Sequence, residues 1–274
     1  KIMKKTKIAL VQMKSLVGQR ENNLKRIGFY TKKAGERQAD IICFPEAAVD
    51  GYSKENSNSD GITNQDIYTR VKKMAAAYSI TILVGFIEKS FGDKPYISHL
   101  VATPDGNINC YRKTHLGVNE GKYFSMGGNL PIFKTPKANI GIQICWETHF
   151  PEISRVMALK GADILFMPFA SPLKAAYRKE NWLKYLPARA YDNTVFVAAC
   201  NLVGPNGKGT TYGGGLLTLD PKGNLMGEDF SGKEGILFTE LDPKLLNDIR
   251  DGDKAGMKSR YYLDGRRPEL YGEI

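Results

Sequence analysis

The order of apolar and amphipathic segments occurs twice along the chain, and this repetition most constrains the fold. Apolar runs and turn residues predict the series strand, helix, strand, helix, strand and hairpin in each half. In the first half the strands are residues 7–13, 40–45 and 80–88, the helices 21–37 and 64–78, and the hairpin 99–112. In the second half the strands are 139–145, 162–168 and 194–200, the helices 151–160 and 179–192, and the hairpin turns at 220–224.

Two similar series in one chain predict an α/β fold of two pseudo-symmetric halves, each supplying a sheet. We expect a single domain over residues 1–274 rather than two domains. Continuous apolar strands indicate burial on both faces, which fits two stacked sheets inside and helices outside. A further strand at 235–241 and a short helix at 243–250 follow, and the irregular tail at about 251–274 wraps the surface or reaches a partner.

The composition is that of an ordinary soluble globule, with 42% hydrophobic and 25% charged residues. No run approaches the ~20 consecutive apolar residues of a membrane span, and no apolar signal core follows the first lysines. We therefore expect no membrane association and a cytoplasmic location. The net charge of +10 comes from lysines spread in pairs, without a basic run interleaved with aromatic residues. It predicts a solvated basic surface and no nucleic-acid partner.

The four cysteines lie far apart and form no Cys-x-x-Cys pair. Cys43, Cys110 and Cys200 sit in apolar strand-like runs, where a free thiol behaves as a small buried hydrophobe. A chain this long and poor in cysteine does not predict a disulfide framework. The three histidines are single and scattered, so we expect no metal site.

Three residues of different chemistry each follow a predicted strand: Glu46, Lys113 and Cys145. Each alone is compatible with a solvated strand end. In open α/β sheets, however, sites form at the carboxyl ends of strands. At Cys145 a strand also stops and a helix begins, where free backbone N–H groups favour negative charge. The three residues together supply a nucleophile, a base and a cation.

A free thiol is only slightly ionised at neutral pH, so it needs a neighbouring base or positive charge. Glu46 can accept the thiol proton and return it to a leaving amine. Lys113 and the backbone N–H of Trp146 can stabilise an oxyanion. Glu147 is expected to point elsewhere, and a His149–Cys145 pair is the alternative to Glu46 as base.

The segments around these residues resemble the three signature motifs of the nitrilase superfamily, the carbon–nitrogen hydrolases. The matching segments are Phe44-Pro45-Glu46, Tyr111-Arg112-Lys113-Thr114-His115-Leu116 and Ile144-Cys145-Trp146-Glu147 with Phe150-Pro151-Glu152. The resemblance runs from about residue 7 to the region of residues 266–269. It implies a four-layer α-β-β-α sandwich, a Glu-Lys-Cys triad, and neither metal nor organic cofactor. It also implies that Glu120 positions the lysine and the substrate.

Within the superfamily, Tyr123-Phe124-Ser125-Met126-Gly127 resembles the amidase and N-carbamoyl amidohydrolase branches, whereas Cys145-Trp146-Glu147 is similar to true nitrilases. The favoured function is hydrolysis of a small amide or carbamoyl amine through a cysteine thioester, releasing ammonia or an amine. A nitrilase with the same triad and a non-catalytic binding protein are the alternatives. The expected substrate-binding residues are Trp146, Tyr52, Asn119 and His149. The resemblance further implies a homodimer or higher homo-oligomer.

Overall fold

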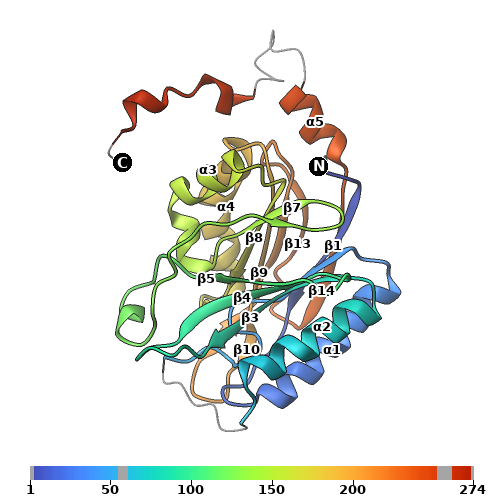
Figure 1. Ribbon diagram of the computed structural model, residues 1–274, viewed down its shortest axis with the longest axis vertical. Helices are drawn as coiled ribbons and strands as arrows, with labels where there is room; N and C mark the ends of the chain where they lie inside the picture. Colours follow the sequence, from blue (N-terminus) through green and yellow to red (C-terminus); the bar gives the residue numbers. More distant parts are fainter. Residues whose placement is uncertain (1–2, 55–60, 252–260, 273–274) are drawn as a thin grey trace.

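The structure is a computed structural model that describes residues 3–54, 61–251 and 261–272. Two six-stranded sheets stack face to face, and helices cover the two outer faces (Figure 1). The predicted α-β-β-α sandwich is therefore confirmed. The part of the tail at residues 252–260 and 273–274 lies outside the described residues.

The first sheet has the order β14-β1-β2-β3-β4-β5 and the second the order β13-β12-β9-β8-β7-β6. The strands of the first sheet are β14 (Gly235–Leu241), β1 (Thr6–Gln12), β2 (Ile41–Cys43), β3 (Thr81–Glu88), β4 (Tyr96–Ala102) and β5 (Ile108–Arg112). Those of the second are β13 (Leu225–Asp229), β12 (Leu216–Leu219), β9 (Phe196–Asn201), β8 (Ile164–Phe169), β7 (Asn139–Ile142) and β6 (Phe133–Lys134).

The two sheets share one pairing pattern, which is the predicted pseudo-symmetry. In the first sheet β1, β2 and β3 are parallel and the β4–β5 hairpin continues antiparallel. In the second sheet β7, β8 and β9 are parallel, and β12 and β13 continue antiparallel. The late strand β14 crosses back to pair antiparallel with β1. The carboxyl ends of the parallel strands in both halves thus supply the loops from which a site can form.

Four helices form the outer layers: α1 (Arg20–Glu36), α2 (Asn64–Ala77), α3 (Pro151–Leu159) and α4 (Ala175–Tyr191). The first two pack on the first sheet and the last two on the second (Figure 1). Successive side chains of β1 point to opposite faces of the sheet. Leu10 therefore packs in the core between the two sheets, whereas Val11 packs in the core under α1 and α2. Between the sheets, the sulfur atoms of Cys43 and Cys200 lie 3.9 Å apart.

Some boundaries differ from the predicted ones. Strand β7 ends at Ile142, three residues before Cys145, because the chain turns into the 3-10 helix Cys145–His149. Helix α4 begins at Ala175 instead of residue 179. The antiparallel ribbon of β10 (Val203–Pro205) and β11 (Thr211–Gly213) was not predicted from the sequence. These short segments lack the apolar periodicity that marks the longer strands.

The C-terminal region is described only in part, at residues 235–251 and 261–272. Helix α5 (Pro243–Asp251) is followed in residues 261–272 by two 3-10 turns, Tyr262–Gly265 and Pro268–Leu270. The ring of Tyr262 contacts that of Tyr191 on α4, so this segment lies over the second helical layer. In the described part of the chain, every helix is too short or too polar to cross a membrane.

Candidate active site

Glu46 lies in the tight turn that follows β2. Its side chain is 1% exposed, and Oε2 accepts a hydrogen bond of 2.9 Å from the backbone N–H of Ala170, at the end of β8. The turn is anchored at its far end by Asp50, which is paired with the buried guanidinium of Arg20. Asp50 also accepts a 2.7 Å hydrogen bond from the N–H of Ile87. The carboxylate of Glu46 is therefore held by both sheets.

Gly85 on β3 makes room for this turn. A Cβ at position 85 would lie 2.5 Å from both the Ala47 nitrogen and the Pro45 oxygen, which is closer than real Cβ atoms approach. The backbone N–H of Val49 donates to the Gly85 oxygen at 3.0 Å. Close contact of the turn with β3 therefore fixes the position of Glu46.

Lys113 directly follows β5 and is 1% exposed. Its backbone N–H continues the β4–β5 ladder by donating to the Ile97 oxygen at 2.9 Å. The Nζ atom donates to Glu46 Oε1 at 2.9 Å and lies 3.0 Å from Glu120 Oε2. One buried ammonium thus bridges two buried carboxylates.

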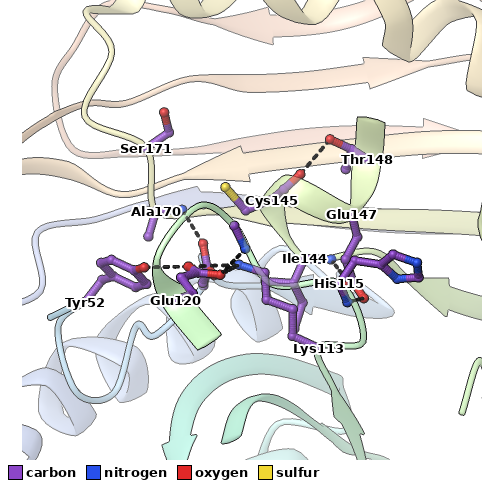
Figure 2. A network of polar contacts seen from close by, with 12 residues as sticks. Tyr52, Lys113, His115, Glu120, Ile144, Cys145, Glu147, Thr148, Ala170 and Ser171 are labelled. Atoms are coloured by element: carbon purple, nitrogen blue, oxygen red, sulfur yellow. Dashed lines mark hydrogen bonds and ion pairs between the residues drawn. The ribbon is translucent and has the colours of Figure 1, made fainter. Parts of the chain in front are cut away.

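Glu120 opens a short 3-10 turn, Glu120–Lys122, and is held from three sides. Besides the Lys113 ammonium, its carboxylate accepts a hydrogen bond of 2.5 Å from the Tyr52 hydroxyl (Figure 2). It also accepts one of 2.6 Å from the Gly117 N–H. Tyr52 is itself fixed, because its carbonyl accepts hydrogen bonds from Asn206 Nδ2 and the Tyr212 hydroxyl, both at 3.3 Å. The unpredicted ribbon β10–β11 therefore supports the site.

Cys145 is the first residue of the 3-10 helix after β7 and has a backbone φ of +51°. This left-handed conformation is uncommon outside glycine, and such strain concentrates at functional sites. The Thr148 hydroxyl donates to the Cys145 carbonyl at 2.7 Å and stabilises the turn. Figure 2 shows the sulfur projecting from this turn beside Ala170 and Ser171.

Glu147 is fully buried and ties the cysteine turn to the lysine strand. One carboxylate oxygen accepts hydrogen bonds from the Tyr111 hydroxyl at 2.6 Å and from the Thr114 N–H and hydroxyl at 2.7 and 2.6 Å. The other accepts a 2.7 Å hydrogen bond from the Ile144 N–H. Glu147 points away from the Cys145 thiol, as expected, but its cross-sheet contacts could not be foreseen from sequence spacing.

Burial and charge set the protonation states at the site. Burial raises the pKa of Glu46, against the attraction of Lys113. Burial, followed by the charge of Glu46, raises the pKa of the Cys145 thiol to about 12. Burial alone would lower the pKa of Lys113, but Glu46, Cys145 and Glu120 together raise it above its usual value. At neutral pH the site therefore holds a neutral thiol beside a permanent cation.

Two cavities meet at Cys145 and Trp146. The larger, of about 730 Å³, is also lined by Lys113, Glu120 and Tyr52. The smaller, of about 220 Å³, is lined by further residues of the second half: His149, Phe169, Ser171, Leu173, Arg178, Asn181 and Tyr185. A small molecule at the sulfur can thus extend in two directions.

Of the four predicted binding residues, three line a cavity and one does not. Trp146 borders both cavities and Tyr52 the larger one. His149 lines the smaller cavity, where its ring stacks on that of Tyr185 with centroids 4.6 Å apart. Asn119 is exposed, begins the Glu120 turn with φ +66°, and is not among the residues that line either cavity.

Sequence reasoning missed Arg178, which is 5% exposed and lines the smaller cavity. In the sequence, its position four residues before Trp182 indicates that both side chains lie on one face of a helix, and a buried Trp182 would then place Arg178 on the buried face. Phe169 and Trp182 pack together in the core, with ring centroids 4.9 Å apart. Across residues 3–54, 61–251 and 261–272, no group of three or more His, Cys, Asp or Glu residues could hold a metal ion.

The chain is similar in sequence and fold to known hydrolases. The chain is 31% identical to a probable nitrilase of Schizosaccharomyces pombe, over 98% of both chains, and 32% identical to a citrullinase of Francisella tularensis, over 99% of both. In fold it is similar to an amidase of Nesterenkonia sp. AN1, with a TM-score of 0.81, 24% identity, and coverage of 97% of this chain and 95% of the other.

The family described as carbon-nitrogen hydrolase matches residues 7–251, which include every strand of both sheets except the first residue of β1. The sandwich fold and the relatives that cover nearly the whole chain point the same way. The chain belongs to the carbon-nitrogen hydrolase family and is an enzyme that hydrolyses carbon–nitrogen bonds.

Proposed function

We propose that this enzyme is an amidase in which Cys145 is the nucleophile, Glu46 the general acid and base, and Lys113 the electrostatic stabiliser. The observation that carries the proposal is the buried Glu46–Lys113–Glu120 group beside the thiol at the mouth of a cavity. Glu120 acts as a positioning residue, because Lys113 and Tyr52 both bind it.

Acylation begins when a carboxamide carbon reaches the sulfur. Because the thiol is neutral at pH 7, its proton has to leave as the S–C bond forms, and Glu46 accepts it. Lys113 and the N–H of Trp146 stabilise the oxygen of the tetrahedral intermediate. Glu46 then protonates the amide nitrogen, the C–N bond breaks, and ammonia or an amine departs from a thioester on Cys145.

Deacylation uses the same groups in reverse. Glu46, again ionised, takes a proton from water, whose oxygen attacks the thioester carbonyl. The second tetrahedral intermediate collapses, the C–S bond breaks, and the proton passes from Glu46 to the sulfur. A carboxylic acid leaves, and the neutral thiol is restored.

The substrate class follows from cavity size and from the relatives. A cavity of about 730 Å³ is of the size that takes small molecules. The citrullinase relative and a 2-oxoglutaramate amidase of Bacillus subtilis are named for small carbamoyl or amide substrates. We propose that this enzyme acts on a small amide or carbamoyl compound.

Trapping of the acyl group tests the proposal. With hydroxylamine present, the thioester partitions between water and hydroxylamine, so the enzyme should form a hydroxamate while releasing ammonia from simple amides. Intact-mass spectrometry after rapid quenching should show the acyl group on Cys145. Ammonia release without hydroxamate and without adduct would contradict the thioester route.

A nitrilase is the second candidate, favoured by the Cys145-Trp146-Glu147 sequence and by the probable nitrilase relative. The same triad would add the thiol to a nitrile carbon and give the acid after water addition. Parallel assays with butyronitrile and butyramide separate the two, since an amidase consumes the amide far faster. Turnover of neither compound would contradict both candidates for these simple substrates.

We also propose that the enzyme forms a homodimer or higher homo-oligomer and resides in the cytoplasm. Large apolar side chains of the second helical layer and the C-terminal segment are exposed: Leu159, Leu183, Tyr191, Leu270 and Tyr271. Exposed aromatic and large apolar side chains are enriched at interaction surfaces. Light scattering should give a mass at least twice the 30.5 kDa of the chain; a mass of 30.5 kDa would contradict the oligomer.

A further inference from the structure

The two buried carboxylates of the site are bound by almost the same set of hydrogen-bond donors. Glu46 and Glu120 each accept one hydrogen bond from a backbone N–H, at 2.9 and 2.6 Å. Both also contact the Lys113 ammonium, at 2.9 and 3.0 Å. Among the described residues they differ in one donor, the Tyr52 hydroxyl, which binds Glu120 at 2.5 Å (Figure 2).

This difference decides where a proton goes. With both carboxylates ionised, the group of Glu46, Glu120 and Lys113 has two negative charges against one positive charge. The two carboxylates therefore compete for a proton, which goes to the one whose anion is stabilised less. The hydroxyl donor stabilises the anion of Glu120 and not that of Glu46. Glu46 is also the more deeply buried of the two, which acts in the same direction.

Tyr52 is a permanent and fixed donor. Burial, followed by the charges of Glu46 and Glu120, raises the pKa of Tyr52 above its ordinary value of 10.0, so the hydroxyl keeps its proton. The backbone of Tyr52 is held separately, because its carbonyl accepts hydrogen bonds from Asn206 and Tyr212. Removal of the hydroxyl alone therefore leaves these backbone contacts in place.

Other ionisable side chains line the same cavity: Lys54, Lys113, Cys145, Lys208 and Tyr212. Burial, followed by the charge of Glu46, raises the pKa of both Cys145 and Tyr212, so these two are neutral at pH 7. Lys54 and Lys208 are exposed, where water and salt screen their charges. In the part of the chain that the structure describes, Lys113 is the one member of this set that binds the two carboxylates.

We propose that Tyr52 keeps Glu120 ionised and thereby makes Glu46 the carboxylate that receives the proton of the thiol. The inference rests on the proposed role of Glu46 as general base and acid. A proton on Glu46 can pass to the departing nitrogen, whereas a proton on Glu120 would weaken the pair that holds Lys113. Tyr52 is thus a positioning residue, which acts on the reaction through Glu120.

Two pH profiles distinguish the two carboxylates. Alkylation of Cys145 by iodoacetamide needs Glu46 as an ionised base and does not need turnover. The value of kcat/KM for butyramide also needs ionised Glu120, which holds Lys113. In the wild type Glu46 takes up the first proton, so both rates should fall along one common acid limb.

Tyr52→Phe should separate the two limbs. Without the hydroxyl donor, Glu120 competes better for the proton that Glu46 carries in the wild type. The limb of kcat/KM should move to higher pH, because the pair takes up its first proton more easily. The limb of alkylation should move to lower pH, because Glu46 then stays ionised further into the acid range. We expect a separation of about 1 pH unit, as for a lost hydrogen bond to a charged group.

Two further variants are the controls. Tyr212→Phe removes a hydroxyl from the same cavity that contacts the Tyr52 carbonyl and neither carboxylate, so its two limbs should coincide. Glu120→Gln removes the competing carboxylate, and Tyr52→Phe added to it should move the alkylation limb no further. Circular dichroism shows whether each variant is folded.

The remaining outcomes separate this proposal from the proposed function. Absence of amide turnover by the wild type, or an alkylation limb that Glu46→Gln leaves in place, would contradict the proposed function itself. A limb that depends on Glu46 but stays common to both rates in folded Tyr52→Phe would overturn only the role of Tyr52. Limbs that already differ in the wild type would overturn it too. A further shift by Tyr52→Phe in the Glu120→Gln background would show that Tyr52 acts on Glu46 directly, which also overturns it.

Discussion

The carboxylate of Glu147 accepts hydrogen bonds from both the backbone N–H and the hydroxyl of Thr114, at 2.7 and 2.6 Å. Thr114 directly follows Lys113, and Glu147 lies two residues after Cys145. The lysine from one sheet and the cysteine from the other are therefore held in register by a buried contact that touches neither reacting group. This contact explains how two halves of the chain can maintain one catalytic geometry.

We predict that Glu147→Gln lowers kcat by about 10- to 100-fold. Both oxygens of Glu147 accept hydrogen bonds, so the NH₂ group of a glutamine would face a donor such as the Ile144 N–H and shift the Cys145 turn. Thr114→Val removes one hydroxyl but keeps the backbone N–H, and should have a smaller effect. Steady-state kinetics and the alkylation rate of Cys145 measure the change. Loss of stability with normal kcat and normal alkylation in the folded fraction would refute the positioning role.

Gly85 gives a second positioning prediction. Gly85→Ala adds a Cβ that would lie 2.5 Å from the turn carrying Glu46, so the turn has to move. A displacement of about 1 Å at a catalytic group typically costs about 10²-fold in rate, and we expect a loss of that order in kcat. Gly128→Ala is the control, since a Cβ there meets nothing within 4 Å. Equal activity of the two variants would show that Gly85 does not position Glu46.

The dependence of kcat/KM on pH reports the ionisation of Glu46. Glu46 must be ionised to act as base, so activity falls as pH falls through its pKa, which burial raises above the ordinary 4.5. We expect the acid limb above pH 4.5, and a plateau to at least pH 9 because the thiol pKa is about 12. Glu46→Gln should lower activity by about 10²- to 10⁴-fold and abolish the acid limb. An unchanged acid limb in that variant would assign it to another group.

Alkylation by iodoacetamide should distinguish the four cysteines. Cys145 borders both cavities, whereas Cys43 and Cys200 are fully buried between the sheets. Burial raises the pKa of both Cys145 and the partly buried Cys110 to about 12, so access and a neighbouring base, rather than the pKa, distinguish these two thiols. With Glu46 available as a base, Cys145 should be labelled first, and peptide mapping at short times measures this. Uniform labelling of all four would count against an accessible, activated thiol.

Much of this site could be predicted because Glu46, Lys113 and Cys145 each come after a strand that the sequence marks by its apolar residues. In each sheet the carboxyl ends of the parallel strands lie at one edge. Glu46 and Lys113 leave the first sheet there, and Cys145 leaves the second, so the three residues lie close together. The family resemblance added Glu120, which the sequence alone presents as an ordinary loop charge.

The rest depends on contacts between segments distant in sequence. The hydrogen bonds of Glu147 cross from one sheet to the other, and no local pattern encodes them. Arg178 stands in a polar stretch typical of a solvated helix, and its spacing from Trp182 is the one local sign that its side chain packs against Phe169 and Trp182. Asn119 was expected to bind substrate, yet its side chain is exposed and lines neither cavity.

Ammonia release from the same amide by the wild type and by Cys145→Ala tests most directly whether Cys145 is the nucleophile. Circular dichroism verifies that the variant is folded. If Cys145 is the nucleophile, its removal eliminates the thioester route, and we expect a loss of at least about 10⁴-fold in kcat. Retention of wild-type activity by folded Cys145→Ala would show that Cys145 is not the nucleophile.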